Sequence, residues 1–188
     1  SDVCSSDLRG EADGLICGTF GRYDLHLHYI DQVIGRREGA QNYYAMNLLV
    51  LPNRTLFLGD TYVNADPSAR QLAEMTLLAA EEIRRFGIVP KVALVSHSSF
   101  GSSNHPSAAK MRDTLALLTE LAPELEIEGE MQGDAALSEA VRQGVFPNSR
   151  LKGEANLLIM PTVDAANISF NMLMTTAGNN LKIGRAHV

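Results

Sequence analysis

Residues 91–123 read KVALVSHSSFGSSNHPSAAKMRDTLALLTELAP, and this stretch decides the fold. Its first six residues are apolar on both faces of an extended chain, which is typical of a buried strand in a parallel sheet. A loop rich in serine follows, and behind it residues 106–123 carry apolar side chains at helical spacing after a proline. The stretch therefore predicts a buried strand, a loop at its carboxyl end and a helix that packs back against the sheet.

The same alternation of short apolar runs and longer amphipathic stretches continues on both sides. Residues 52–54 separate two of the runs closely enough for a hairpin, which adds one antiparallel element. The pattern predicts an α/β fold of three layers, α/β/α, with a largely parallel sheet. Strands are expected at residues 14–18, 46–51, 55–60, 91–96, 125–131 and 155–161, and helices at residues 22–37, 66–87, 106–123, 134–146 and 164–178.

The sequences at the two ends of the chain differ in character from the sequence beside them. One permitted choice of codons for IGRAHV, residues 183–188, gives DVCSSD, residues 2–7, when its reverse complement is translated. A short sequencing adapter read in opposite directions would produce both hexapeptides, whereas ordinary frayed termini are the alternative. We expect residues 1–8 and 183–188 to be adapter-derived. The domain between them, residues 9–182, would then be incomplete and truncated at its C-terminus.

Composition limits the classes of protein to which the chain can belong. Hydrophobic residues make up 45% of it, which predicts a globular domain with a good core. The formal net charge of -6 provides no basic field, so neither nucleic acid nor a membrane is an expected partner. Cys17 is the single cysteine outside the expected adapter segments; it is expected to be a buried structural thiol, and a reducing cytoplasm fits this cysteine usage.

The serine-rich loop is the first candidate site, because ligands of open α/β sheets bind beyond the carboxyl ends of the strands. Hydroxyls, free amides and a helix N-terminus together suit an anion such as a phosphate. The alternative is a polar connection in which a serine only caps the helix. The loop offers Ser96, Ser98, Ser99, Ser102 and Ser103, placed around Gly101.

Charged side chains follow the later strands. Glu128, Glu130 and Asp134 are close together in the sequence, and two of them could form a carboxylate pair for acid–base chemistry. The expectation is that all three are solvated and that Asp134 caps the helix that follows it. Arg150 and Lys152 are the best-placed cations for a phosphate, although exposed loops commonly hold both.

No metal site is expected. His26 and His28 alternate, so on a helix they do not share a face, and a metal would need further ligands. Asp164 and Asn167 are expected to cap the last helix rather than to bind a ligand. The other histidines without a ligand spacing are His97 and His105.

Three blocks of the chain, residues 66–103, 125–138 and 148–168, resemble the phosphate acetyltransferase family in order and spacing. They include SHSSFGSS, EGEMQGDAALS and KGEANLLIMP. They are most similar to the version that is fused behind the catalytic domains of large bacterial NADP-dependent malic enzymes. The resemblance runs from about Asp13 to Gly178 and so covers nearly the whole chain.

The resemblance implies a sheet of the phosphate acetyltransferase type and a cleft between two subdomains, which in true transferases holds coenzyme A and acetyl phosphate. In those enzymes the serine loop usually reads like SFSTKGS, so Phe100 stands at the position of a lysine. Glu154 likewise stands where the transferases tend to carry lysine. Losing two cations beside an anionic substrate weakens the stabilisation of charge during acyl transfer. The family's later Ser-Arg segment would lie beyond Gly178.

From the resemblance we expect the regulatory and oligomerisation portion of an NADP-dependent malic enzyme. The parent would convert malate to pyruvate with NADP and a divalent metal, Mg or Mn, whereas this window alone would be inactive, with no catalytic residue and no cofactor. The expected partners are acetyl-CoA or a related acyl phosphate, as effector, and further copies in a homo-oligomer. The expected ligand-binding residues are Ser96, Ser98, Ser99, Gly101, Ser102, Lys152 and Asn156.

Two alternatives come from other functional classes. The chain resembles enzymes that interconvert acetyl phosphate and acetyl-CoA, so a free-standing phosphate acetyltransferase is the first. The second is a structural module with an empty cleft, which Phe100 and Glu154 favour.

Overall fold

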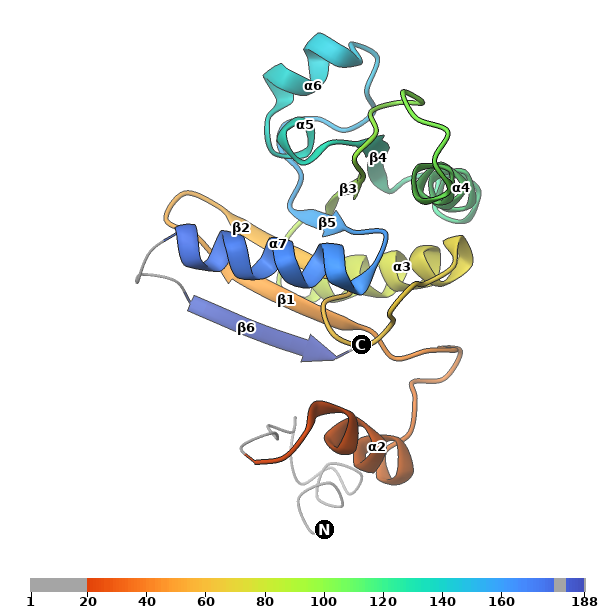
Figure 1. Cartoon of the computed structure of the whole chain (residues 1–188), viewed down its shortest axis with the longest axis vertical. Coiled ribbons are helices and arrows are strands. Elements are labelled where there is room, and N and C mark those ends of the chain that lie inside the picture. The colour runs from red at the N-terminus through yellow and green to blue at the C-terminus, as the bar shows by residue number, and fades with distance from the viewer. Residues whose placement is uncertain (1–19, 178–181, 188) are drawn as a thin grey trace. The chain divides into compact units, whose positions relative to one another are not determined.

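The structure, a computed structural model, describes residues 20–177 and the backbone of residues 182–187. The chain divides into two units, residues 1–42 and 43–188. The expected strand at residues 14–18, with Cys17, lies outside the described residues. The elements in chain order (Figure 1) are α2 (Tyr23–Val33), β1 (Ala45–Val50), β2 (Thr55–Gly59), α3 (Ala69–Arg85), β3 (Lys91–Val95), α4 (Pro106–Leu121), β4 (Glu126–Met131), α5 (Gly133–Leu137), α6 (Glu139–Val145), β5 (Leu157–Ile159), α7 (Val163–Thr176) and β6 (Lys182–His187).

All the elements after α2 belong to the second unit, whose sheet has the strand order β4-β3-β5-β2-β1-β6. Strands β2, β5, β3 and β4 run parallel to one another. Strand β1 pairs antiparallel with β2 through the hairpin expected at residues 52–54, and β6 pairs antiparallel with β1. The predicted α/β fold with a largely parallel sheet is therefore confirmed.

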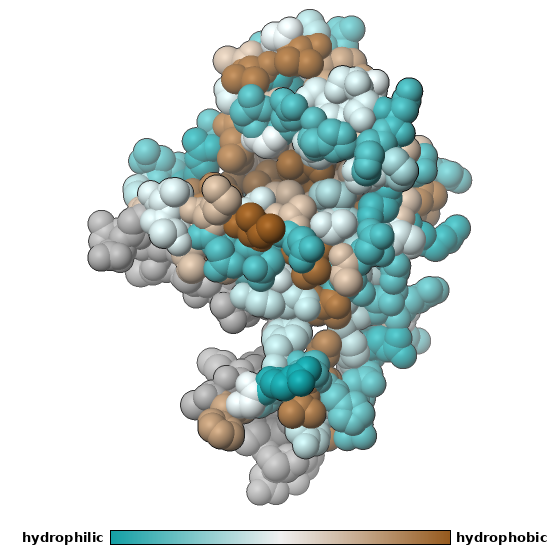
Figure 2. Space-filling view, viewed as in Figure 1, coloured by the Kyte–Doolittle hydropathy of each residue, from teal (hydrophilic) through white to brown (hydrophobic). Residues whose placement is uncertain are grey.

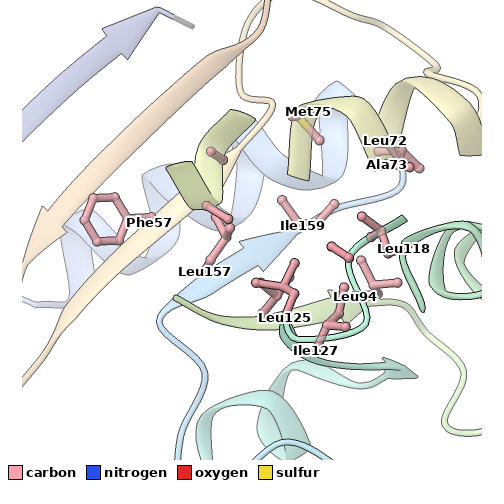
Figure 3. Packing of buried hydrophobic residues seen from close by; sticks show 14 of the residues in the cluster. Phe57, Leu72, Ala73, Met75, Leu94, Leu118, Leu125, Ile127, Leu157 and Ile159 are labelled. Carbon is pink, nitrogen blue, oxygen red and sulfur yellow. The ribbon is translucent and has the colours of Figure 1, made fainter. Parts of the chain in front are cut away.

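Helices cover both faces of this sheet, because β3 is apolar on both sides. Val92 and Leu94 belong to the core beneath α3 and α4, whereas Ala93 belongs to the core beneath α5 and α7. Figure 3 shows the first of these cores, in which Leu94 and Ile127 of neighbouring strands lie near Leu118 of α4. Burial on both faces gives the three layers that the sequence predicted.

Helix α3, expected at residues 66–87, begins at Ala69, directly after Ser68. The Ser68 hydroxyl accepts a hydrogen bond from the backbone N–H of Gln71, and the Gln71 side chain accepts one from the backbone N–H of Ser68. This reciprocal capping box satisfies two N–H groups that lack partners within the helix. The helix ends at Arg85, just before Gly87 adopts a φ of +73°, which an L side chain rarely adopts.

The single helix predicted at residues 134–146 was wrong. The chain instead forms α5 and α6, with Ser138 between them in an extended conformation. The Ser138 hydroxyl accepts a hydrogen bond from the N–H of Val141 and so caps α6. A serine that bonds to the backbone in this way competes with helix continuation.

Among residues 20–177, none of the helices combines the length and the apolar character that a membrane-spanning helix needs.

The backbone of residues 182–187 pairs with β1 from Val50↔Lys182 to Ala45↔His187. Strand pairing of this kind joins backbone N–H and C=O groups and so needs no particular side chains. The adapter origin of residues 1–8 and 183–188, and the domain bounds 9–182, therefore remain predictions.

Candidate functional site

The serine loop lies at the carboxyl ends of two neighbouring parallel strands. It begins with Ser96, directly after β3, and ends at His105, the N-cap of α4. Its backbone is bonded to the end of β4, because the Ser96 N–H donates to the carbonyl of Met131 at 2.8 Å and the Phe100 N–H to the carbonyl of Glu130 at 2.7 Å. The loop thus occupies the edge at which open α/β sheets bind ligands.

Glu130 is the centre of the hydrogen-bond network in this loop. Its Oε1 atom accepts from Ser98 Oγ at 2.6 Å, from the Gly101 N–H at 3.0 Å and from Arg112 Nη1 at 2.9 Å. Burial raises the pKa of Glu130, but the hydrogen bonds from Ser98 and Gly101, together with the Arg112 charge, outweigh it, so the pKa lies below its usual value. The carboxylate is therefore held ionised beneath the loop.

Two serines of the loop use their hydroxyl protons within the loop itself. Ser98 is fully buried and gives its only hydroxyl proton to Glu130, so Ser102 must be the donor in the 3.1 Å contact between the Ser98 and Ser102 hydroxyls. Ser98 Oγ also accepts from the Ser103 N–H, and Ser102 Oγ accepts from the Ser99 N–H. These side chains shape the loop and have no proton left to give to a ligand.

Ser96 and Ser99 have a different role in the network, since each appears in it only as an acceptor. Ser96 Oγ accepts from the Ser98 N–H at 3.2 Å, and Ser99 Oγ accepts from the Gln132 N–H at 3.3 Å. Ser96 is buried, whereas Ser99 is half-buried. Of the serines expected to bind a ligand, Ser99 is thus the one whose hydroxyl can both reach solvent and donate.

Phe100 and Gly101 form the turn of the loop with positive φ angles of 48° and 87°. The Phe100 ring stacks on Phe146, which follows α6, with centroids 4.4 Å apart and planes inclined by 16°. An apolar contact therefore fills the position at which the resemblance to the transferases implies a lysine. At the other such position, Glu154 forms a 3.1 Å ion pair with Arg54.

Two cations of α4, Arg112 and Lys110, lie at the same edge of the sheet as the loop, and sequence reasoning missed them. Arg112 Nη1 donates to the carbonyl of Ser103 at 3.0 Å as well as to Glu130. Lys110 Nζ contacts Asp66 Oδ1 and the carbonyl of Pro161, each at 2.6 Å. Their place in the first turns of the helix that follows the loop was the available signal, because the N-terminal turns of a crossover helix lie at the same edge as the strand end.

Lys152 and Asn156 lie at the other end of the parallel strands. Asn156 Oδ1 accepts from the N–H of Lys91, the first residue of β3, and its amide nitrogen donates to the carbonyl of Val89. Lys152 Nζ donates to the carbonyl of Ser149. The length of β3, about 16 Å, separates this group from the serine loop. The structure does not bring the two groups together, and ligand binding by either of them stays a prediction.

The expectation that Glu128, Glu130 and Asp134 are solvated was wrong for the two glutamates, both of which lie within β4. Glu128 is 6% exposed and accepts from the Arg150 N–H at 2.8 Å, while Glu130 is 0% exposed. Asp134 is exposed, but it lies in the first turn of α5 and does not cap it; the N-cap is Gln132. A tertiary pairing that joins residues far apart in the chain buries both glutamates.

The last helix also begins differently from the expectation. Thr162 caps α7 by accepting from the Ala165 N–H, so Asp164 lies in the first turn and Asn167 donates to the carbonyl of Thr61. Sequence reasoning placed the cap two residues too late.

The histidines do not form a metal centre in the described part of the chain. His97 and His105 lie edge to face with ring centroids 5.6 Å apart, and His97 Nε2 is 3.2 Å from Ser103 Oγ. Within residues 20–177, no group of three or more His, Cys, Asp or Glu side chains is arranged to hold a metal ion.

Comparison with known proteins gives a consistent set of relatives. The NADP-dependent malic enzyme of Escherichia coli (strain K12) is 54% identical over 176 residues, which cover 94% of this chain but 23% of that protein. A phosphate acetyltransferase of Paracoccus denitrificans is 36% identical over 90% of this chain and 55% of its own length. The chain thus spans about a quarter of the malic enzyme that it matches.

Solved structures and a family model agree with these relatives. The crystal structure of a phosphotransacetylase from Streptococcus pyogenes superposes with a TM-score of 0.88 at 27% identity, over 98% of this chain and 56% of that one. The family model "Phosphate acetyl/butaryl transferase" matches residues 8–185. Because this match spans nearly the whole chain, the protein belongs to the phosphate acetyl/butaryl transferase family.

Proposed function

We propose that this chain is the regulatory and oligomerisation portion of an NADP-dependent malic enzyme, and that acetyl-CoA or a related acyl phosphate binds at the serine loop as effector. The observation that carries the proposal is the 54% identity to a malic enzyme of which this region forms 23%. The identity to a phosphate acetyltransferase is lower, at 36%.

The contacts at the two lysine positions support binding without acyl transfer. Phe100 is stacked on Phe146, and Glu154 adds a negative charge that Arg54 pairs. Acyl transfer through an anionic substrate needs positive groups that stabilise the developing charge, and neither position supplies one. An effector needs only to bind, so the same positions do not exclude a regulatory role.

The groups available to an anionic effector at this edge are the Ser99 hydroxyl and the α4 cations. Arg112 uses Nη1 for both of its bonds, which leaves the N–H groups of its other two nitrogens for a phosphate. Lys110 lies on the same helix. The loop is held in place by its own hydrogen bonds, so little ordering would oppose binding.

An effector can regulate only if it binds one state of the oligomer better than another. Acetyl-CoA at the serine loop would therefore shift a homo-oligomer between two arrangements. NADP and the divalent metal are proposed for the rest of the longer protein, since the residues described here offer no cluster of metal ligands.

The test is calorimetry on the full-length protein with acetyl-CoA, acetyl phosphate and coenzyme A, together with malate-dependent reduction of NADP at increasing acetyl-CoA. We expect binding of acetyl-CoA and a change in malate turnover, both weakened in Ser99→Ala and both retained in Thr119→Ala, which removes a hydroxyl on the exposed part of α4. Absence of binding would support the empty structural module. Formation of acetyl-CoA from acetyl phosphate and coenzyme A would support the transferase.

A further inference from the structure

A recess of about 440 Å³ lies away from the serine loop, between the β1–β2 hairpin, the α5–α6 pair and α7. In Figure 2 the surface between α6 and α7 is hollowed and largely brown, which marks apolar side chains. Small-molecule sites are commonly concave and of this size, with apolar walls and few polar groups. The lining residues are Leu51, Arg54, Leu56, Asp134, Leu137, Ser138, Val141 and Leu173.

The recess owes its shape to the break between α5 and α6. Because the chain turns at Ser138, Leu137 at the end of α5 and Val141 in the first turn of α6 form one wall. Leu56 of β2, which is 1% exposed, and Leu173 of α7 also line the recess. An aliphatic group that lies in this open recess would contact aliphatic side chains on the side that faces the protein.

Two opposite charges accompany this apolar lining. Arg54 Nη1 contacts Glu154 Oε2 at 3.1 Å and the carbonyl of Leu137 at 3.3 Å, which holds the guanidinium in place. The other two nitrogens of Arg54 have no partner among residues 20–177. Asp134 Oδ1 accepts from the Ala135 N–H at 2.8 Å, and Oδ2 is without a partner among the same residues.

These groups select the chemistry of a ligand. A simple carboxylate would meet Arg54 but also the negative charges of Asp134 and of Glu154, and a simple amine would meet Asp134 but also the positive charge of Arg54. A zwitterion satisfies both, with its carboxylate on the guanidinium and its ammonium on the aspartate. We propose that this recess binds an aliphatic α-amino acid, with the side chain among Leu56, Leu137 and Leu173.

The site is distinct from the proposed effector site. Arg54 and Leu56 lie at the amino end of β2, whereas the serine loop follows the carboxyl end of β3, and β2 and β3 both run parallel to β5 between them. Acetyl-CoA binding can therefore be measured beside amino-acid binding in each variant. The proposal of an amino-acid site can therefore fail while that of the effector site holds, and the reverse.

The experiment is calorimetry on the full-length protein with leucine as probe. Three further probes each lack one feature: 4-methylpentanoate lacks the ammonium, 3-methylbutylamine lacks the carboxylate, and glycine lacks the aliphatic group. The variants are Arg54→Gln and Asp134→Asn, with Arg70→Gln and Asp113→Asn as matched controls at exposed positions outside the recess.

We expect wild-type protein to bind leucine more tightly than any of the three partial probes. Each recess variant should weaken leucine binding by about tenfold, because each removes one charge-assisted contact. Asp134→Asn should bind 4-methylpentanoate at least as well as wild type does, since a repelling charge is gone. The controls should bind leucine unchanged. Equal binding of glycine and leucine, unchanged binding in Arg54→Gln, or no binding of leucine would each overturn the proposal.

Discussion

Ser98 donates its hydroxyl proton to Glu130 across 2.6 Å and so joins the loop after β3 to the end of β4, although 32 positions separate the two residues in the chain. Around this bond the same carboxylate oxygen also holds Gly101 and Arg112. The loop that sequence reasoning treated as a ligand cradle is thus first a structural unit, and its stability can be tested apart from its binding.

Glu130→Gln should lower the free energy of unfolding by about 2–4 kcal/mol, because it removes the charge from a buried site whose donors, Arg112 among them, then lose a charged partner. Urea denaturation of wild type and variant measures the difference. Glu120→Gln, at an exposed position of α4, is the control and should change stability by less than about 0.5 kcal/mol.

The stabilising effect of Glu130 should depend on pH in a defined direction. The pKa of Glu130 is lower in the folded protein than in the unfolded chain, where the pKa of a glutamate is about 4.3. Its contribution is therefore complete above the unfolded pKa and is lost as the pH falls through the lowered folded pKa. The stability gap between wild type and Glu130→Gln should narrow between about pH 5 and pH 3. A gap that stays constant over this range would contradict the assigned ionisation.

Ser98→Ala and Ser99→Ala should separate the shape of the loop from its binding. Ser98→Ala removes a buried donor to a carboxylate and should cost about 1–3 kcal/mol of stability. Ser99→Ala removes a half-buried hydroxyl and should change stability by less than about 0.5 kcal/mol. Thermal melts of both variants, with acetyl-CoA titrations beside them, measure the two effects. Equal melting temperatures would show that the Ser98–Glu130 bond does not stabilise the loop.

Phe100 offers a measure of backbone strain, since its φ of +48° lies in the region that favours glycine. Phe100→Ala and Phe100→Gly both lose the stack on Phe146, but only the glycine variant relieves the backbone. Phe100→Gly should therefore be more stable than Phe100→Ala by about 1 kcal/mol in chemical denaturation. The reverse order would mean that the φ angle carries no strain.

Gly129→Ala should be strongly destabilising. A Cβ atom at this position would lie 2.7 Å from the Cβ of Leu94 and 2.8 Å from its carbonyl oxygen, between two paired strands. We expect the free energy of unfolding, measured by urea denaturation, to fall by about 3 kcal/mol or more, because the backbone of β3 cannot move away without breaking its pairing with β4. A Cβ atom at Gly144 of α6 would meet no atom within 4 Å, so Gly144→Ala should raise the free energy of unfolding by about 0.5–1 kcal/mol.

The sequence predicted those parts of the fold that depend on local signals. Apolar runs located β1 to β5, and the start signals at residues 66–68 located the start of α3 to within three residues. Burial on both faces and helix capping both depend on neighbouring residues, so the sequence reveals them. The break at Ser138 was missed because the apolar period of residues 134–146 continues across it. A capping bond to Val141 outweighed that period.

The candidate site was only partly predictable. The position of the serine loop follows from the rule for strand ends, but the use of Ser98 by Glu130 depends on pairing between β3 and β4, which no local pattern states. Lys152 and Asn156 precede β5, and residues before a parallel strand lie at the edge opposite to those that follow its neighbour. That signal was present in the sequence and was not used.

The internal bonding of the serine loop has a consequence for the rate at which the proposed effector would bind. Because the hydrogen bonds among Ser98, Ser102 and Glu130 that shape the loop form within the chain itself, the free and occupied backbones should superpose closely. Association then needs no folding step. The association rate constant of the proposed effector would then be set by diffusion and by the field of the nearby cations, so we expect it to fall as ionic strength rises.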